Sequence, residues 1–134
     1  MARVTPPIFE ALSRLKTSWP KRGWSWDSRF EAVASTFGTD LINEAKASAA
    51  MALPHVWTDK TLGSAPGPLR DLAKKTGGVR AAQMLLSADA QGILIPFGLW
   101  WPWEDGRTIS LRIGIEGASS DQRLLLCSTF GVEP

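Results

Sequence analysis

The sequence has a single cysteine, Cys127, and a single histidine, His55, among its 134 residues. One cysteine excludes an internal disulfide and any metal site built from several cysteines. Carboxylates do not cluster at ligand spacing, and no phosphate-binding glycine loop or dinucleotide fingerprint is present. We therefore expect no metal, no cofactor and no catalytic residues. A Cys127–His55 nucleophile pair would need the two side chains to meet in space, so we interpret them as a strand cysteine and a loop histidine.

Long apolar runs are also missing. No stretch approaches the roughly 18 apolar residues of a membrane span. Residues 1–15 lack the apolar core of a signal peptide. These absences predict a cytoplasmic protein without membrane contact. The net charge of +2 gives no general basis for nucleic-acid binding. The length predicts one domain over residues 1–134, with a core of its own.

Helical patterns dominate the first part of the chain. Pro7 suits a first helical turn, and Trp19-Pro20 ends the helix that follows it. Apolar residues from Phe30 to Phe37 form a helical stripe that stops at Gly38. The next helix is rich in alanine; the two could be one kinked helix, but Gly38 favours two. The predicted helices span residues 8–19, 29–37, 41–53 and 68–75, and we expect residues 55–68 to be an irregular, mobile loop.

Strand patterns dominate the second part. Apolar and polar residues alternate from Arg107 to Glu116, which is typical of a half-buried strand. Residues 79–88 fit a helix or a strand, and their glycine-rich flanks favour a strand. Residues 123–130 complete the predicted sheet. Together the patterns predict an α+β fold, with N-terminal helices (about residues 7–76) packed on one face of a C-terminal, three- to four-stranded antiparallel meander (about residues 81–130).

The central hairpin of this meander has two alternative registers. A two-residue loop would pair Leu99 with Arg112 and put the apolar rows of the two strands on opposite faces. A three-residue loop over residues 104–106 would pair Leu99 with Leu111 and put both rows on one face. We predict the second register because it gathers the apolar rows, with Gly106 in the left-handed conformation. Trp101 then faces the core and Trp100 the outer face.

This outer face carries the predicted function. The predicted partner-binding residues are Pro96, Trp100, Trp103 and Arg112. Tryptophan and arginine are enriched at binding hot spots. A half-apolar sheet face is expected to be covered by another protein surface. That cover could be the chain's own helices. We predict a small soluble interaction or adaptor protein that acts by protein–protein contact, with a protein partner or with a second copy as a homodimer.

Two other functions remain open. A pocket between the helices and the sheet, covered by residues 55–68, would make a small-molecule binding domain or an enzyme. The lack of an assembled catalytic set argues against the enzyme. Nucleic acid is the least expected partner, because the basic excess is local. Single-stranded nucleic acid could bind one segment in which Arg14, Lys16, Lys21 and Arg22 alternate with Trp19, Trp24 and Trp26.

Overall fold

The computed structural model describes residues 7–134. These residues form four α-helices, two short 3₁₀ turns (η) and six strands. In chain order the elements are α1 (Pro7–Ser18), β1 (Ser25–Asp27), β2 (Ala32–Gly38), η1 (Thr39–Leu41), α2 (Ile42–Ala52), β3 (His55–Trp57), η2 (Leu62–Ser64), α3 (Gly67–Lys75), β4 (Met84–Ser87), β5 (Ile95–Pro102), β6 (Thr108–Glu116) and α4 (Ser120–Phe130). No helix among the described residues is long and apolar enough to cross a membrane.

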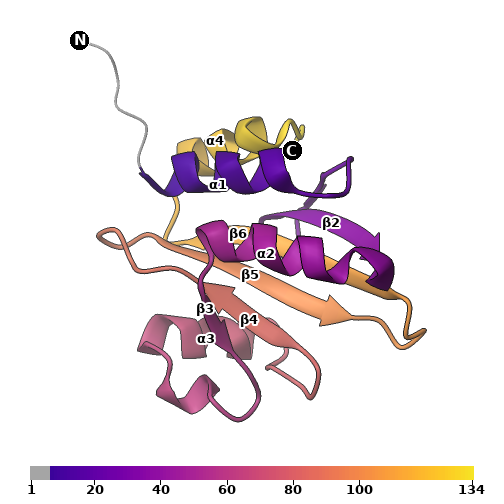
Figure 1. Ribbon diagram of the computed structural model, residues 1–134. Helices are drawn as coiled ribbons and strands as arrows, with labels where there is room; N and C mark the ends of the chain where they lie inside the picture. The colour runs from indigo at the N-terminus through magenta and orange to yellow at the C-terminus, as the bar shows by residue number, and fades with distance from the viewer. Residues whose placement is uncertain (1–6) are drawn as a thin grey trace.

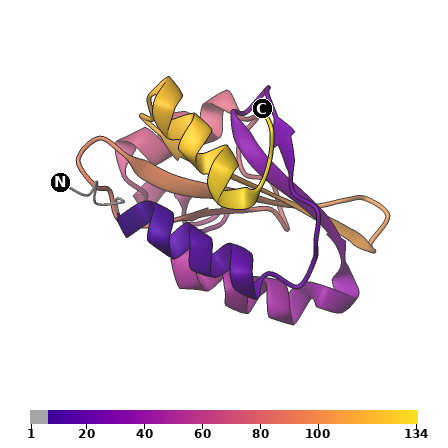
Figure 2. The same ribbon diagram turned by 90° about the horizontal axis from the view of Figure 1, so that it is seen from above.

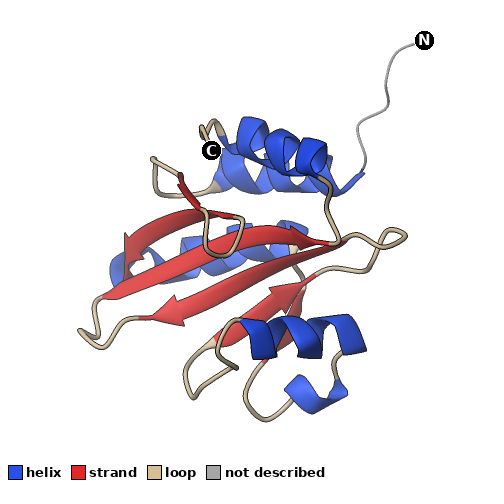
Figure 3. Ribbon diagram, turned by 180° about the vertical axis from the view of Figure 1, so that it is seen from behind, coloured by secondary structure: helices blue, strands red, loops and turns tan. Residues whose placement is uncertain are grey.

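The six strands form one antiparallel sheet in the order β1-β2-β6-β5-β4-β3. Helices α1, α2 and α4 cover one face, which we call the three-helix face, and α3 packs on the opposite face, the α3 face (Figures 1 and 3). The α+β class is therefore confirmed. The predicted order of helices followed by a meander is wrong, because β1, β2 and β3 alternate with helices along the chain and only β4, β5 and β6 form a meander.

The larger core lies under the three-helix face. α1 buries Ile8, Leu12 and Leu15 at helical spacing against Leu111 and Ile113 of the sheet. The alanines of α2 leave room for α1, and the two helices lie side by side (Figure 2). The Ser48 hydroxyl of α2 donates a hydrogen bond to the Leu15 carbonyl of α1, 2.9 Å away. A buried polar bond therefore fixes a contact that small side chains make possible.

A second, smaller core lies under the α3 face. Leu69 and Leu72 of α3 are buried against Leu85, Phe97 and Leu99 of the sheet. The start of α3 carries a proline in its first turn, where a missing N–H costs nothing. Predicted helices at residues 8–19, 41–53 and 68–75 are thus confirmed, and so is a strand within residues 79–88. Residues 55–68, predicted to be irregular, contain β3 and η2.

The predicted helix over residues 29–37 is wrong, because this segment contains the strand β2. Val33 and Phe37 are buried, and a spacing of four fits one helical turn as well as two strand repeats. Ser35 between them is buried too, and its hydroxyl accepts a hydrogen bond from the Trp19 indole N–H at 2.9 Å. The burial therefore repeats every two residues, with Thr36 exposed.

The predicted strand over residues 123–130 is also wrong, because this segment lies in α4. Ser119 and Gln122 form a reciprocal capping box, and Gly131 ends the helix in the left-handed conformation. Leu126 and Phe130, again four residues apart, are buried with Cys127. Leu124 is exposed.

The predicted register of the β5–β6 hairpin is wrong as well. Leu99 pairs with Arg112 and Trp100 with Leu111, so the apolar rows lie on opposite faces. The loop has four residues, 104–107, and the Trp103 N–H donates to the Thr108 carbonyl at 2.8 Å. The predicted left-handed Gly106 is confirmed, with φ of 69°. Apolar side chains on both faces of the sheet are stable here because helices cover both faces.

The register places Trp100 in the larger core with only 2% of its surface exposed, whereas Trp103 is 51% exposed. We expect Trp100→Ala to lower the free energy of unfolding by about 3–5 kcal/mol, because it leaves a cavity under α2. Trp103→Ala, the matched control, should change it by no more than about 0.5 kcal/mol. Urea denaturation followed by circular dichroism measures both, and equal losses would contradict this register.

Candidate functional site

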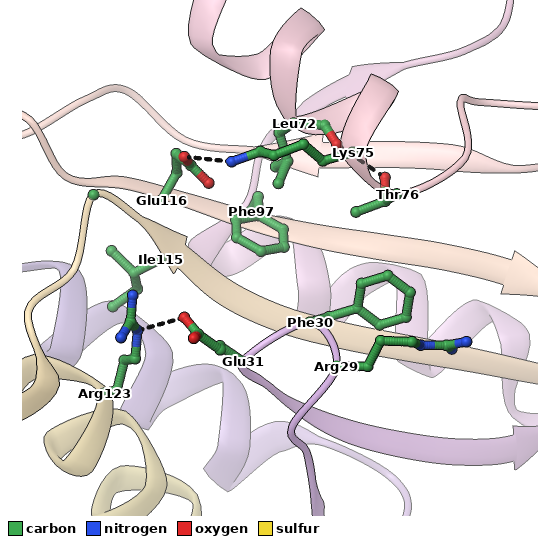
Figure 4. Close-up of a pocket in the computed structure, with 11 residues that line it drawn as sticks. Arg29, Phe30, Glu31, Leu72, Lys75, Thr76, Phe97, Ile115, Glu116 and Arg123 are labelled. Atoms are coloured by element: carbon green, nitrogen blue, oxygen red, sulfur yellow. Dashed lines mark hydrogen bonds and ion pairs between the residues drawn. The ribbon is translucent and has the colours of Figure 1, made fainter.

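A cleft of about 480 Å³ opens on the α3 face, between the end of α3, the β1–β2 turn and the start of α4 (Figure 4). We call it the Phe30 cleft. Its volume lies within the usual range of small-molecule sites. The residues that line it are Arg29, Phe30, Glu31, Leu72, Lys75, Thr76, Phe97, Ile115, Glu116, Gly117 and Arg123.

The interior of the cleft is apolar. Phe97 of β5 and Leu72 of α3 are buried there. Phe97 lies across Gly114, its partner on β6, and a side chain at Gly114 would collide with the ring. The missing side chain at Gly114 therefore gives the Phe97 ring the room it occupies beside β6.

The β1–β2 turn supplies one wall of the cleft, and a partly buried ion pair holds this turn. Asp27 accepts a hydrogen bond from the Arg29 backbone N–H at 3.0 Å and from the Arg112 Nε at 2.8 Å. Arg112 projects from β6 and also donates to the Ser110 hydroxyl at 2.8 Å. The two charged side chains are only 18% and 19% exposed. Arg112 thus fastens the turn to the α3 face.

Aromatic contacts fix the position of Phe30 at the end of this turn. Its ring meets Trp101 edge-on, with 5.4 Å between centroids. The guanidinium carbon of Arg112 lies 5.0 Å from the centre of the Trp101 ring and 5.7 Å from the centre of the Phe30 ring. The guanidinium carbon of Arg29 lies 4.2 Å from the centre of the Phe30 ring. Such cation–π contacts favour an ordered ring. Phe30 also borders a smaller cleft of about 220 Å³, which shares Arg29 and Thr76 with the larger one.

The rim of the Phe30 cleft is charged. Arg123 of α4 pairs with Glu31 at 2.7 Å, and Lys75 of α3 pairs with Glu116 of β6 at 3.1 Å (Figure 4). Arg29 makes no ion pair with any residue from 7 to 134 that the structure describes. The lining therefore holds three cations and two carboxylates, an excess of one positive charge. The side chains of both rim pairs are between 30% and 62% exposed, and pairs open to solvent contribute only about 0–1 kcal/mol.

Glu31 has a conformation that residues with a side chain rarely adopt. Its φ is +51°, in the left-handed region. Such a conformation persists only where the surroundings hold it, and it is frequent at binding sites. Here the partly buried Asp27–Arg112 pair on one side and β2 on the other hold the turn. From this turn the Glu31 carboxylate reaches Arg123, 2.7 Å away.

The structure separates the four residues predicted to bind a partner. Pro96 and Trp100 are buried under the three-helix face, whereas Arg112 lies on the α3 face. Arg112 stacks on Trp101, on the side of the sheet opposite Trp100. Trp103 alone is well exposed, at the tip of the β5–β6 hairpin. A common outer face, which the predicted register created, does not exist.

The residues of the Phe30 cleft were not predicted from sequence. Phe30 and Glu31 fell within a predicted helix, and Arg123 within a predicted strand. The Asp27 side chain accepts a backbone N–H as a helix cap would, but it does so in a turn. Residues 55–68, predicted to cover a pocket, do not line this cleft.

Comparisons of the chain with protein-family models, with curated proteins and with solved structures find no match.

The Asp27–Arg112 pair makes stability depend on pH. Burial alone would raise the pKa of Asp27, but the hydrogen bond and charge of Arg112, with two backbone donors, outweigh it and lower the pKa below its usual value. Because the pKa of Asp27 is lower in the folded state, the pair stabilises the fold fully above the pKa of Asp27 in the unfolded chain, about 3.9. This stabilisation is lost as the pH falls through the pKa of Asp27 in the folded state.

We therefore expect Asp27→Asn to lower the free energy of unfolding at pH 7 by about 1–3 kcal/mol. Its stability should also fall less steeply below about pH 4 than that of the wild type. Urea titrations between about pH 2.5 and 7 measure both effects. Asp71→Asn, on the exposed side of α3, is the control. Parallel pH profiles for wild type and Asp27→Asn would show that the pair does not contribute in this way.

Proposed function

We propose that the protein is a small-molecule binding domain whose ligand occupies the Phe30 cleft. The observation that supports this best is the combination of an apolar, aromatic interior with a charged rim in a cleft of about 480 Å³. Ligand sites in proteins combine these features. The polar groups of the Phe30 cleft favour binding over catalysis. Both carboxylates are already paired with cations, and the Thr76 hydroxyl donates hydrogen bonds to helix carbonyls.

The rim indicates the kind of ligand. A flat apolar or aromatic body fits between Phe30 and Phe97, where burial of apolar area stabilises it. An anionic group on that body can take the place of Glu31 at Arg123, or of Glu116 at Lys75. This exchange costs little, because exposed ion pairs are weak. The excess positive charge of the lining favours an anion over a cation. An aromatic or aliphatic carboxylate meets all three conditions.

Native mass spectrometry of protein purified from its natural host tests for a bound small molecule. Titration calorimetry then measures the affinity for that molecule, or for benzoate and indole-3-acetate as probes. We expect Phe30→Ala to weaken binding at least about 10-fold, because the ligand loses an aromatic wall. Lys75→Ala should weaken it by about 2- to 5-fold, through loss of one exposed charge.

Lys74→Ala is the matched control, because Lys74 neighbours Lys75 on α3 but does not line the cleft. Its affinity should equal that of the wild type. Binding that Phe30→Ala leaves unchanged would place the ligand elsewhere, and the absence of binding to any probe or co-purified molecule would remove this function.

Protein–protein contact, the function predicted first, keeps one supporting observation. Trp103 is a large aromatic residue, 51% exposed, at the tip of a hairpin that extends beyond the sheet (Figure 1). Exposed tryptophan is enriched at interfaces. A contact through this tip would use Trp103 alone of the four predicted residues, because the other three support the fold.

Light scattering over a range of protein concentrations tests self-association. We expect a dimer in the wild type that weakens at least about 10-fold in Trp103→Ala, as for other interface tryptophans. Leu124→Ala, an exposed apolar residue of α4, is the control and should still dimerise. A wild type that remains monomeric and retains no partner during affinity purification would exclude this candidate.

A further inference from the structure

A second cleft, of about 560 Å³, lies between the end of α1, the loop that follows it and the end of α4. It opens on the three-helix side, away from the Phe30 cleft. The residues that line it are Lys16, Thr17, Trp19, Lys21, Arg22, Gly23, Trp24, Phe130 and Gly131. We call it the Trp24 cleft. It contains three cations and no carboxylate.

This one-sided charge extends through the surrounding sequence. Residues 11–26 hold four lysines and arginines and no aspartate or glutamate. Their charge of +4, in a chain with a net charge of +2, leaves −2 for all other residues. Lys16, Lys21 and Arg22 are exposed and make no ion pair within the described part of the chain. The small net charge therefore conceals a local concentration of cations that a phosphate can neutralise.

An aromatic residue is held in place among these cations. Trp24 is only half-buried, and its ring packs on Phe130 and Trp19, with centroid distances of 4.6 and 5.2 Å. Trp19 is itself fixed by its hydrogen bond to the buried Ser35. Gly23, with φ of +90°, turns the chain so that Trp24 follows closely after Arg22. The indole is thus a supported surface beside the charges.

We propose that the Trp24 cleft binds a nucleotide unit, with its base against Trp24 and its phosphate at Lys16, Lys21 and Arg22. A supported aromatic ring beside unpaired cations is how proteins bind single-stranded nucleic acid without reading its sequence. The same chemistry would bind a free nucleotide. This site is separate from the Phe30 cleft and does not depend on the function proposed for it.

Fluorescence anisotropy with a labelled 12-nucleotide oligo-dT strand tests the proposal, with AMP and inorganic pyrophosphate as competitors. We expect the double variant Lys21→Glu/Arg22→Glu to bind the strand at least about 10-fold more weakly at low salt. The slope of log affinity against log salt concentration should fall by about 0.7, because each neutralised phosphate of a single strand contributes about 0.7 and one is lost. Trp24→Leu, which keeps apolar packing, should weaken binding by about 5- to 150-fold.

Lys60→Glu/Lys74→Glu is the matched control, with the same change of charge at exposed positions outside the cleft. It should retain wild-type affinity. Strand binding that AMP does not displace would identify a single strand as the ligand, and displacement by AMP a free nucleotide. Binding that pyrophosphate displaces as well as AMP, an equal loss in the control variant, or no binding of strand or AMP would each overturn the proposal.

Discussion

The partly buried ion pair between Asp27 and Arg112 is the constraint on which the α3 side of the molecule depends. Arg112 stands in the central strand β6, but its partner comes from the edge strand β1, 85 residues earlier in the chain. The pair brings the β1–β2 turn over the sheet, so that Phe30 can pack against Trp101. Charged pairs rarely add much net stability when buried, but they determine which segments must meet. Here the pair determines the position of the β1–β2 turn, which forms one wall of the Phe30 cleft.

Two covered faces explain most of what sequence patterns did and did not predict. The helices α1, α2 and α3 and the strands β4, β5 and β6 followed from periodicity and from proline and glycine positions. The hairpin register did not, because gathering apolar rows on one face is an advantage only when the other face meets water. In β5 both rows are buried: Phe97 under α3 and Trp100 under α2. A run such as residues 93–101, with hardly a polar residue, is the sequence signature of a strand covered on both sides.

The two misassigned segments share one cause. Val33 and Phe37, like Leu126 and Phe130, are four residues apart, and this spacing satisfies a helix and a strand equally. Neighbouring residues could have distinguished the helix from the strand. Ser119 and Gln122 match the capping box of a helix, and β-branched Val33 and Thr36 suit a strand. The candidate site was beyond such local signals. Glu31 and Arg123, or Lys75 and Glu116, meet only because the sheet order β1-β2-β6-β5 brings distant segments together.

Strand β1 has only three residues, too few for a ladder to hold it firmly. Side chains at its two ends compensate, and they do so on opposite sides of the sheet. Before β1, Trp24 packs into the three-helix side, behind Trp19 and its bond to Ser35. At the last position of β1, Asp27 binds Arg112 on the α3 face. Each attachment also shapes a cleft, since Trp24 lines one and Phe30 the other. The contacts that keep a short edge strand in the sheet are therefore the same contacts that order both candidate binding surfaces.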